Sequence, residues 1–201
     1  MREVEIKAVV DDWDARRDRV VEAGAELSFA GRLEDRRYDT PARDLSARGE
    51  VLRVRVYRSD GGERAEIGWK GPTSQESGYK VREELGASTP DAASMALILR
   101  QLGYLVTQAI DREIVQYNLN GTTIRFERYP RMDDLVEVEG SPTGIERAVA
   151  VLGIPRSEFT AERLPRFVRR FEERTGRRAA ICDADLQRSD RRALHERDEE
   201  A

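Results

Sequence analysis

The sequence predicts an α+β fold in which an eight-stranded antiparallel β-barrel has helices packed on its outside. Eight segments within about 150 residues have the alternation or composition of strands, enough for a sheet that closes, or nearly closes, into a barrel. Tight turns join several of these segments, which makes neighbouring strands antiparallel. Amphipathic helices lie between and after the strands and can cover their apolar faces.

The strands are recognised by alternation and by the turns between them. The stretch EVLRVRVYR alternates apolar and basic residues most clearly. Turns at SDGGE, TSQESG and LNG separate neighbouring strands, DTPARDLSARG is a longer loop, and a break is expected near Gly31. In chain order the predicted strands cover residues 2–10, 27–38, 50–58, 64–72, 79–87, 105–117, 122–129 and 133–140.

Four helices are predicted from apolar periodicity and end signals. The first covers about residues 11–23 and ends before a glycine. The second covers residues 89–104, where Thr89 suits the N-cap and the following proline suits the first helical position. Two closing helices are expected over residues 143–154 and 161–176.

We divide the chain into one domain over residues 1–176 and a charged tail over residues 177–201. The tail has many charges and little apolar periodicity, which favours disorder; a short docked helix over about residues 184–194 is the alternative. Cys182 and His195, the only residues of their types, fall in this tail, so we expect both to lie outside any mechanism and Cys182 to be exposed.

Composition excludes several classes of protein. The chain has 35 basic and 39 acidic residues, a formal net charge of −4, which argues against a broad nucleic-acid-binding surface. No apolar run approaches the roughly 20 residues of a membrane span. A single cysteine fits a reducing compartment. We therefore expect a cytoplasmic protein with neither nucleic acid nor membrane as partner.

Charged residues recur on one face of most predicted strands, and Val, Ile or Leu occupies the other. At the N-terminus, for example, Glu3, Glu5 and Lys7 alternate with Val4 and Ile6. If helices cover the apolar faces from outside, the charged faces line the interior. Unpaired charges are too costly to bury in a dry core, so this interior is expected to be hydrated and to hold a ligand.

The interior charges fall into two chemical sets. Magnesium and manganese prefer carboxylate ligands, whereas arginine and lysine suit phosphate. Together the sets are typical of metal-assisted phosphoryl chemistry, and the sequence has no P-loop or dinucleotide-binding glycine pattern. The acidic set is Glu3, Glu5, Glu127, Glu137 and Glu139. The basic set is Lys7, Arg53, Arg55, Lys70, Arg82 and Arg112.

Short motifs occur in a fixed order along the chain. They are E-x-E-x-K at residues 3–7, LRVR at 52–55, WKGP at 69–72, REE at 82–84, a basic residue at 112, IRFE at 124–127 and VEVEG at 136–140. In this ordered set, residues 1–140 resemble the CYTH superfamily, the triphosphate tunnel metalloenzymes. The form of the motifs resembles the class IV adenylyl cyclase branch, the CyaB type.

The resemblance implies an eight-stranded tunnel that binds a triphosphate compound together with Mg²⁺ or Mn²⁺. It implies a catalytic role for Lys7, Arg53 and Glu137. The residues that would bind phosphate are Lys7, Arg53, Arg55, Lys70, Arg82, Arg112 and Arg125. The residues that would bind metal are Glu3, Glu5, Glu84, Glu127, Glu137 and Glu139. A homodimer is in keeping with the family.

Two positions depart from the pattern of the family. The family often has Lys-x-Arg in the long strand, whereas this chain has Arg112 followed two residues later by Ile114. Arg125 is the candidate for the missing charge. The usual aspartate near the seventh strand is Glu127, which is one methylene longer.

Three functions remain open from the sequence. The first is an adenylate cyclase that converts ATP to cyclic AMP and pyrophosphate. The second is a triphosphatase acting on inorganic triphosphate, a nucleoside triphosphate or thiamine triphosphate. The third is a non-catalytic triphosphate-binding module. The first two differ in which phosphorus faces the nucleophile, a matter of a few ångströms.

Overall fold

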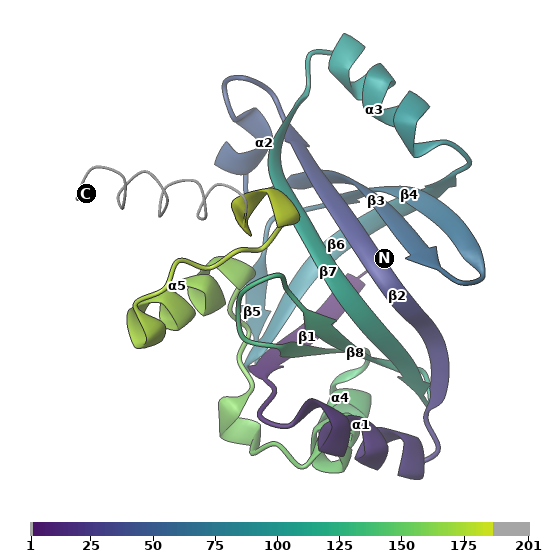
Figure 1. The fold of residues 1–201 in the computed structure, drawn as a ribbon, viewed down its shortest axis with the longest axis vertical. Helices are drawn as coiled ribbons and strands as arrows, with labels where there is room; N and C mark the ends of the chain where they lie inside the picture. The colour runs from purple at the N-terminus through teal and green to yellow at the C-terminus, as the bar shows by residue number, and fades with distance from the viewer. Residues whose placement is uncertain (1, 187–201) are drawn as a thin grey trace, which may run out of the picture.

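The computed structural model describes residues 2–186, and within them nine strands form one antiparallel sheet (Figure 1). The sheet order is β1-β9-β8-β7-β2-β3-β4-β6-β5. Because β1 pairs with both β9 and β6, eight strands close into a barrel. The short strand β5 pairs with the start of β6, on the edge that β4 occupies further along. The strands are β1 Arg2–Val9, β2 Glu26–Asp39, β3 Val51–Ser59, β4 Gly62–Lys70, β5 Ser74–Glu76, β6 Tyr79–Thr89, β7 Leu105–Leu119, β8 Thr122–Arg128 and β9 Leu135–Glu139. The predicted eight-stranded barrel is confirmed.

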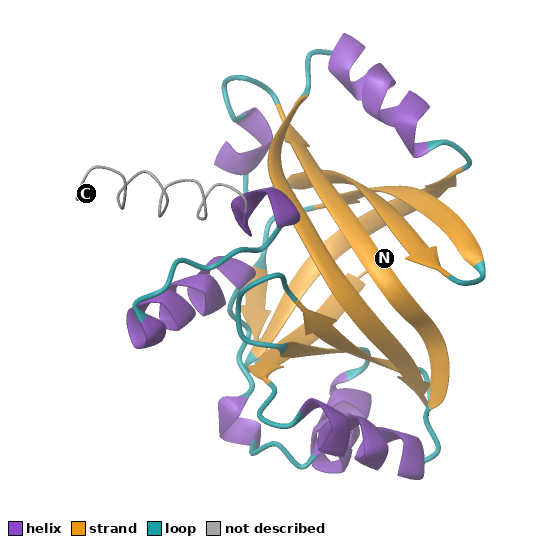
Figure 2. Ribbon diagram, in the orientation of Figure 1, coloured by secondary structure: helices purple, strands orange, loops and turns teal. Residues whose placement is uncertain are grey.

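Helices lie around the barrel, as the purple elements of Figure 2 show. They are α1 Trp13–Glu22, α2 Asp44–Ala47, α3 Ala92–Gln101, α4 Pro142–Leu152, the 3₁₀ turn η1 Arg156–Glu158, and α5 Leu164–Thr175. Helices α1 and α4 pack against each other at one end of the molecule. In the described part of the chain, no helix has the length and hydropathy needed to cross a membrane.

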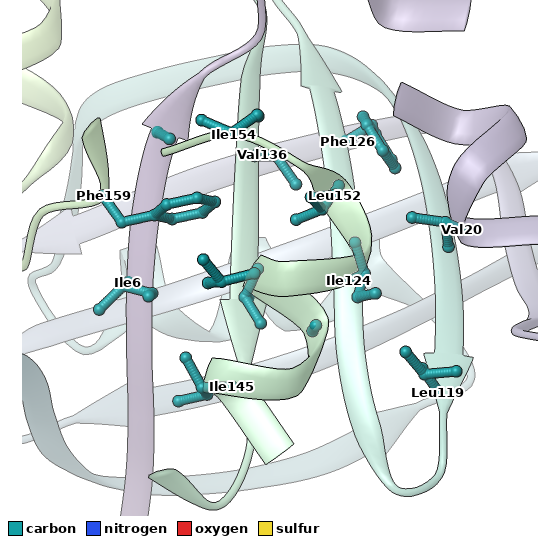
Figure 3. Packing of buried hydrophobic residues seen from close by; sticks show 14 of the residues in the cluster. Ile6, Val20, Leu119, Ile124, Phe126, Val136, Ile145, Leu152, Ile154 and Phe159 are labelled. Atoms are coloured by element: carbon teal, nitrogen blue, oxygen red, sulfur yellow. The ribbon is translucent and has the colours of Figure 1, made fainter. Parts of the chain in front are cut away.

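The main hydrophobic core lies between the barrel wall and helices α1 and α4 (Figure 3). Ile6 of β1 and Ile124 and Phe126 of β8 point outward from the barrel and are fully buried beneath Val20 of α1 and Leu152 of α4. Fully burying an aliphatic or aromatic side chain contributes about 1.5–3 kcal/mol. The apolar faces of these strands therefore look outward, and the charged faces look into the barrel.

Four local predictions were wrong. Helix α3 begins at Ala92, because β6 continues through Thr89 and Asp91 is the N-cap, accepting hydrogen bonds from the next backbone amides. Strand β2 continues through Gly31 without a break; a Cβ at that position would collide with the carbonyl oxygen of Arg58 on β3. The expected loop over residues 39–49 contains α2, and the expected turn over residues 73–78 contains β5.

The segment over residues 177–186 packs against the barrel domain. Ala180 pairs with Arg131, and the amide of Asp111 on β7 donates to the carbonyl of Ile181 at 2.8 Å. Cys182 is buried, so the expectation that it is exposed was wrong. The segment docks mainly through backbone hydrogen bonds, which leave no periodic pattern in the sequence. Its backbone is helical at residues 183–186; His195 and most of the alternative helix lie outside the described residues.

Candidate functional site

The barrel interior is filled by charged side chains from all eight of its strands. They surround a cavity of about 50 Å³, which has room for only a few water molecules. The lining residues are Glu5, Lys7, Arg37, Val51, Arg53, Arg55, Lys70, Lys80, Arg82, Arg112, Arg125, Tyr129, Glu137 and Leu164. All seven residues predicted to bind phosphate therefore lie at one cavity.

Glu137 of β9 is the centre of one ion-pair cluster. Strand register places it opposite Lys7 of β1 and opposite Arg125 of β8. Lys7 forms an ion pair with it, and Arg125 Nη1 donates to Glu137 Oε1 at 2.7 Å. Burial opposes the charged form of each group, but the opposite charges outweigh it. The pKa of Glu137 is therefore well below its usual range, and that of Lys7 is raised.

Glu127 of β8, which is fully buried, is the centre of a second cluster. The hydroxyl of Tyr129 donates to Glu127 Oε2 at 2.7 Å, and Lys7 Nζ lies 4.0 Å from the same oxygen. Arg112 Nε lies 3.2 Å from Glu127 Oε1, but neither atom forms a hydrogen bond within the described chain. Burial, and next the negative charge of Glu127, raises the pKa of Tyr129. Tyr129 is thus a neutral donor, which sequence analysis did not identify.

Asp35 of β2 is a further interior residue that sequence analysis missed. It is almost completely buried, and its Oδ2 lies 3.8 Å from Arg53 Nη1 and 3.6 Å from Arg55 Nε on β3. Burial would raise its pKa, but Arg37, Arg53 and Arg55 outweigh burial and lower it. The available signal is alternation in LEDRR, which places Asp35 and Arg37 on the same face of the strand as Leu33.

Four buried arginine nitrogens lack a hydrogen-bond acceptor in the described part of the chain. They are the Nε atoms of Arg37, Arg53, Arg55 and Arg112. A buried donor without an acceptor costs about 1–3 kcal/mol, more when it is charged. Such donors at an internal cavity favour an anion whose oxygen atoms can accept from several arginines at once. Arg82, by contrast, donates to the carbonyl oxygens of Gly71 at 2.8 Å and Gly49 at 3.1 Å, so it fixes the loops beside the cavity.

Three of the six predicted metal ligands lie together. Carboxylate oxygens of Glu3, Glu5 and Glu139 are all within 4.8 Å of one another, and Glu3 Oε2 is buried with no hydrogen-bond partner among the described residues. Such a set of hard oxygen donors fits Mg²⁺ or Mn²⁺. Glu127 and Glu137 instead belong to the clusters described above. Glu84 forms ion pairs with Arg53 at 2.6 Å and Lys70 at 3.2 Å.

All three lysines of the sequence belong to this site, whereas the chain has 35 basic residues in total. Lys70 forms an ion pair with Glu3, and Lys80 forms one with Glu5. Lys80 was absent from the predicted site, although it shares a strand face with Arg82. Two of the three grouped carboxylates are thus each neutralised by one lysine, whereas Glu139 lies opposite another carboxylate, Glu5.

Burial, followed by repulsion from Glu137 and Glu3, raises the pKa of Glu139 from 4.5 to about 7. Between these two values the folded protein keeps a proton that the unfolded chain has lost, so stability falls as the pH rises. We expect Glu139→Gln, which cannot ionise, to stabilise the metal-free protein by about 1–3 kcal/mol at about pH 8 and to change little at about pH 5. Urea unfolding in EDTA measures the stability of the natural chain and of the variant at each pH. An equal effect of the substitution at the two pH values would contradict the prediction.

A second cavity, of about 320 Å³, forms the mouth of the barrel at one end. It shares Arg37 and Val51 with the internal cavity. Arg43, Glu50 and Arg163 also line it. The mouth is therefore polar and carries charges of both signs.

The chain thus forms a closed antiparallel barrel that faces basic and acidic side chains inward. The chain belongs to the CYTH family: the model of the CYTH domain matches residues 1–141. This family includes adenylyl cyclase-like and triphosphatase-like enzymes. A search of curated protein sequences gives no match.

Solved structures share the fold. A candidate adenylate cyclase from Vibrio parahaemolyticus has a TM-score of 0.70 at 21% identity, with 83% of this chain and 97% of that one covered. A protein from Pyrococcus horikoshii OT3 has a TM-score of 0.67 at 23% identity, with coverages of 80% and 94%. A Hippeastrum protein, HpAC1, described as a candidate adenylyl cyclase with a dominant triphosphatase activity, has a TM-score of 0.57 at 15% identity, with coverages of 80% and 90%.

Proposed function

We propose that this protein is a metal-dependent triphosphatase that hydrolyses a triphosphate compound inside its barrel. The observation that carries the proposal is the set of buried Nε atoms of Arg37, Arg53, Arg55 and Arg112, which have no hydrogen-bond acceptor in the described part of the chain and belong to residues that line the internal cavity. A chain of phosphates offers many acceptor oxygens in a small volume. It can satisfy these donors together, which a single carboxylate cannot.

Substrate binding requires exchange of ion-pair partners, because the internal cavity of about 50 Å³ is too small for three phosphates. Lys7 and Arg125 contact Glu137, and phosphate oxygens would take the place of that carboxylate. Like-charge repulsion would then separate Glu137 from the substrate. A water molecule between them would donate a hydrogen bond to the Glu137 carboxylate, which would orient it as the nucleophile.

Glu3, Glu5 and Glu139 would hold the divalent ion, since their oxygens are grouped and one is without a partner. When bound, the ion supplies charge neutralisation at the phosphate oxygens. Lys70 and Lys80, which pair with Glu3 and Glu5, would be freed toward the substrate as the carboxylates turn to the metal. The basic side chains would also stabilise the pyrophosphate or orthophosphate that leaves.

Adenylate cyclase activity is the second candidate, favoured by the fold shared with the Vibrio parahaemolyticus protein. Cyclisation needs a base and ribose held firmly enough to direct the 3′-hydroxyl at the α-phosphorus. Tyr38 is the one aromatic residue among those lining the mouth, and it is buried in an apolar cluster instead of being free to stack on a base. The charged mouth therefore supports hydrolysis better than cyclisation.

Product analysis tests the proposal directly. The purified full chain is incubated with inorganic triphosphate or with ATP, in Mg²⁺, in Mn²⁺ and in EDTA. We expect metal-dependent orthophosphate release, which disappears in EDTA. Cyclic AMP and pyrophosphate would establish the cyclase instead. Binding of triphosphate without any turnover would instead support a non-catalytic triphosphate-binding module.

A further inference from the structure

The acidic residues of the mouth cavity, Asp39 and Glu50, already have partners within the described chain. Asp39 accepts hydrogen bonds from the backbone amides of Leu45 and Ser46, both at 2.9 Å. Glu50 accepts from Nε and Nη2 of Arg48 at 3.1 and 2.9 Å, in a fork-like pair. Both carboxylates are therefore engaged by groups other than the arginines that line the mouth.

Three arginines line the same cavity, and two of them are free of partners. The side chains of Arg43 and Arg163 form no hydrogen bond or ion pair within the described part of the chain. Arg37 donates to Gln108 Oε1 at 3.0 Å. Its buried Nε lies 3.9 Å from Asp35 Oδ1, beyond hydrogen-bond distance, and has no acceptor among the described residues. The mouth thus offers donors of three guanidinium groups, which suit an anion with several oxygen atoms.

The backbone of Arg43 adopts a conformation that arginine rarely takes. Its φ is 63° and its ψ is 35°, in the left-handed region, where a residue with a Cβ is strained by roughly 1–2 kcal/mol. The turn is fixed on both sides, because the amide of Arg43 donates to the carbonyl of Thr40 and its carbonyl accepts from the amide of Ala47, each at 2.9 Å. An arginine at a position that suits glycine indicates that its side chain is used, and this side chain lines the mouth.

The mouth adjoins the internal cavity of the barrel. Arg37 and Val51 line both cavities. Arg82, which lines the internal cavity, donates to the carbonyl oxygen of Gly49, which lines the mouth, at 3.1 Å. Burial lowers the pKa of Arg82, and the positive charges of Arg163 and Arg37 act in the same direction. An anion in the mouth would therefore relieve repulsion among cations of both cavities.

We propose that the mouth is a further phosphate subsite, in which Arg37, Arg43 and Arg163 hold a phosphate beyond the three held inside the barrel. This inference rests on the proposed function. The oxygens of one additional phosphate can accept from several guanidinium nitrogens, for which arginine is better suited than lysine. The preferred ligand is then a chain of four or more phosphates, either free or attached to a nucleoside.

The test compares inorganic triphosphate with inorganic tetraphosphate, and ATP with adenosine 5′-tetraphosphate. The full chain is titrated by calorimetry in EDTA at about 0.3 M salt, which screens long-range attraction. Tetraphosphate should bind at least about tenfold more tightly than triphosphate. The same preference in the nucleotide pair would support a subsite for attached chains as well, and a preference in the inorganic pair alone would support one for free chains. No preference in either pair would overturn the subsite.

Variants identify the residues that hold the additional phosphate. Arg163→Gln and Arg43→Gly should each reduce the ratio of tetraphosphate to triphosphate affinity at least about threefold. Glycine fits the left-handed backbone at residue 43, so this variant removes the charge without straining the turn. Arg169→Gln, on the exposed face of α5, is the control and should leave the ratio unchanged.

Two results would contradict the assignment in different ways. An unchanged ratio in folded Arg163→Gln and Arg43→Gly would overturn the subsite, while binding of triphosphate would leave the proposed function standing. Failure of the natural chain to bind either inorganic triphosphate or ATP would overturn the proposed function as well.

Discussion

Replacing Lys7 with alanine should abolish hydrolysis of inorganic triphosphate and lower the free energy of unfolding by about 3–5 kcal/mol. Lys7 forms an ion pair with Glu137 and lies 4.0 Å from Glu127, both nearly or completely buried. Removing the ammonium group leaves these carboxylates with less compensation in a medium that solvates them poorly. It also removes a cation that the substrate phosphates would contact. Orthophosphate release and urea unfolding measure the two effects.

Two control variants distinguish the loss of a cation in the barrel interior from the loss of a cation on the surface. Lys7→Arg keeps the charge and should recover most of the stability. Arg169→Ala removes a cation from the exposed face of α5; it should change the free energy of unfolding by no more than about 0.5 kcal/mol and leave hydrolysis unchanged. Stability of Lys7→Ala equal to that of the natural chain, with full turnover, would show that the interior ion pairs do not depend on Lys7.

The second large effect is expected from Glu137→Gln. Turnover should fall at least about 100-fold, because the amide loses the charge that orients water. Binding of inorganic triphosphate in EDTA should become tighter by about 1–2 kcal/mol, because Lys7 and Arg125 no longer have to exchange a carboxylate for the ligand. The substitution is thus expected to strengthen binding and to weaken catalysis. Calorimetry measures the binding, and the orthophosphate assay measures the turnover.

A matched change elsewhere controls for loss of negative charge. Glu173→Gln lies on the exposed face of α5 and should leave turnover and binding as they are in the natural chain. If Glu137→Gln lost binding and turnover in equal measure, Glu137 would be needed to position the cations, and its proposed role with the nucleophile would be wrong.

The barrel could be predicted from the sequence because its signals are local. The alternation in EVLRVRVYR assigns β3, and charged residues two apart mark the inner faces of β1 and β9. Closure could only be inferred from the number of strands, since pairing of β1 with β6 joins segments about 80 residues apart. The predicted end of β6 was wrong because Asp91 competes with Thr89 as the N-cap of α3, and both residue types suit that position.

The site could be predicted as a set of inward-facing charges, but its internal division could not. Register decides that Glu137 meets Lys7, whereas Glu139 meets Glu5, and register depends on tertiary pairing. Asp35 was missed because LEDRRYD carries charges on both faces of its strand.

The positions of the three lysines allow the opening of the barrel to be measured. Arginine supplies every other basic side chain, so primary amines on side chains occur only in the barrel interior, with 12%, 7% and 9% of the side chain exposed for Lys7, Lys70 and Lys80. Acylating reagents and lysine-specific proteases should therefore react with the folded protein slowly, apart from the α-amino group at residue 1. The rate of these reactions at the three lysines should therefore depend on how often the barrel opens. A bound phosphate chain should slow the reactions further.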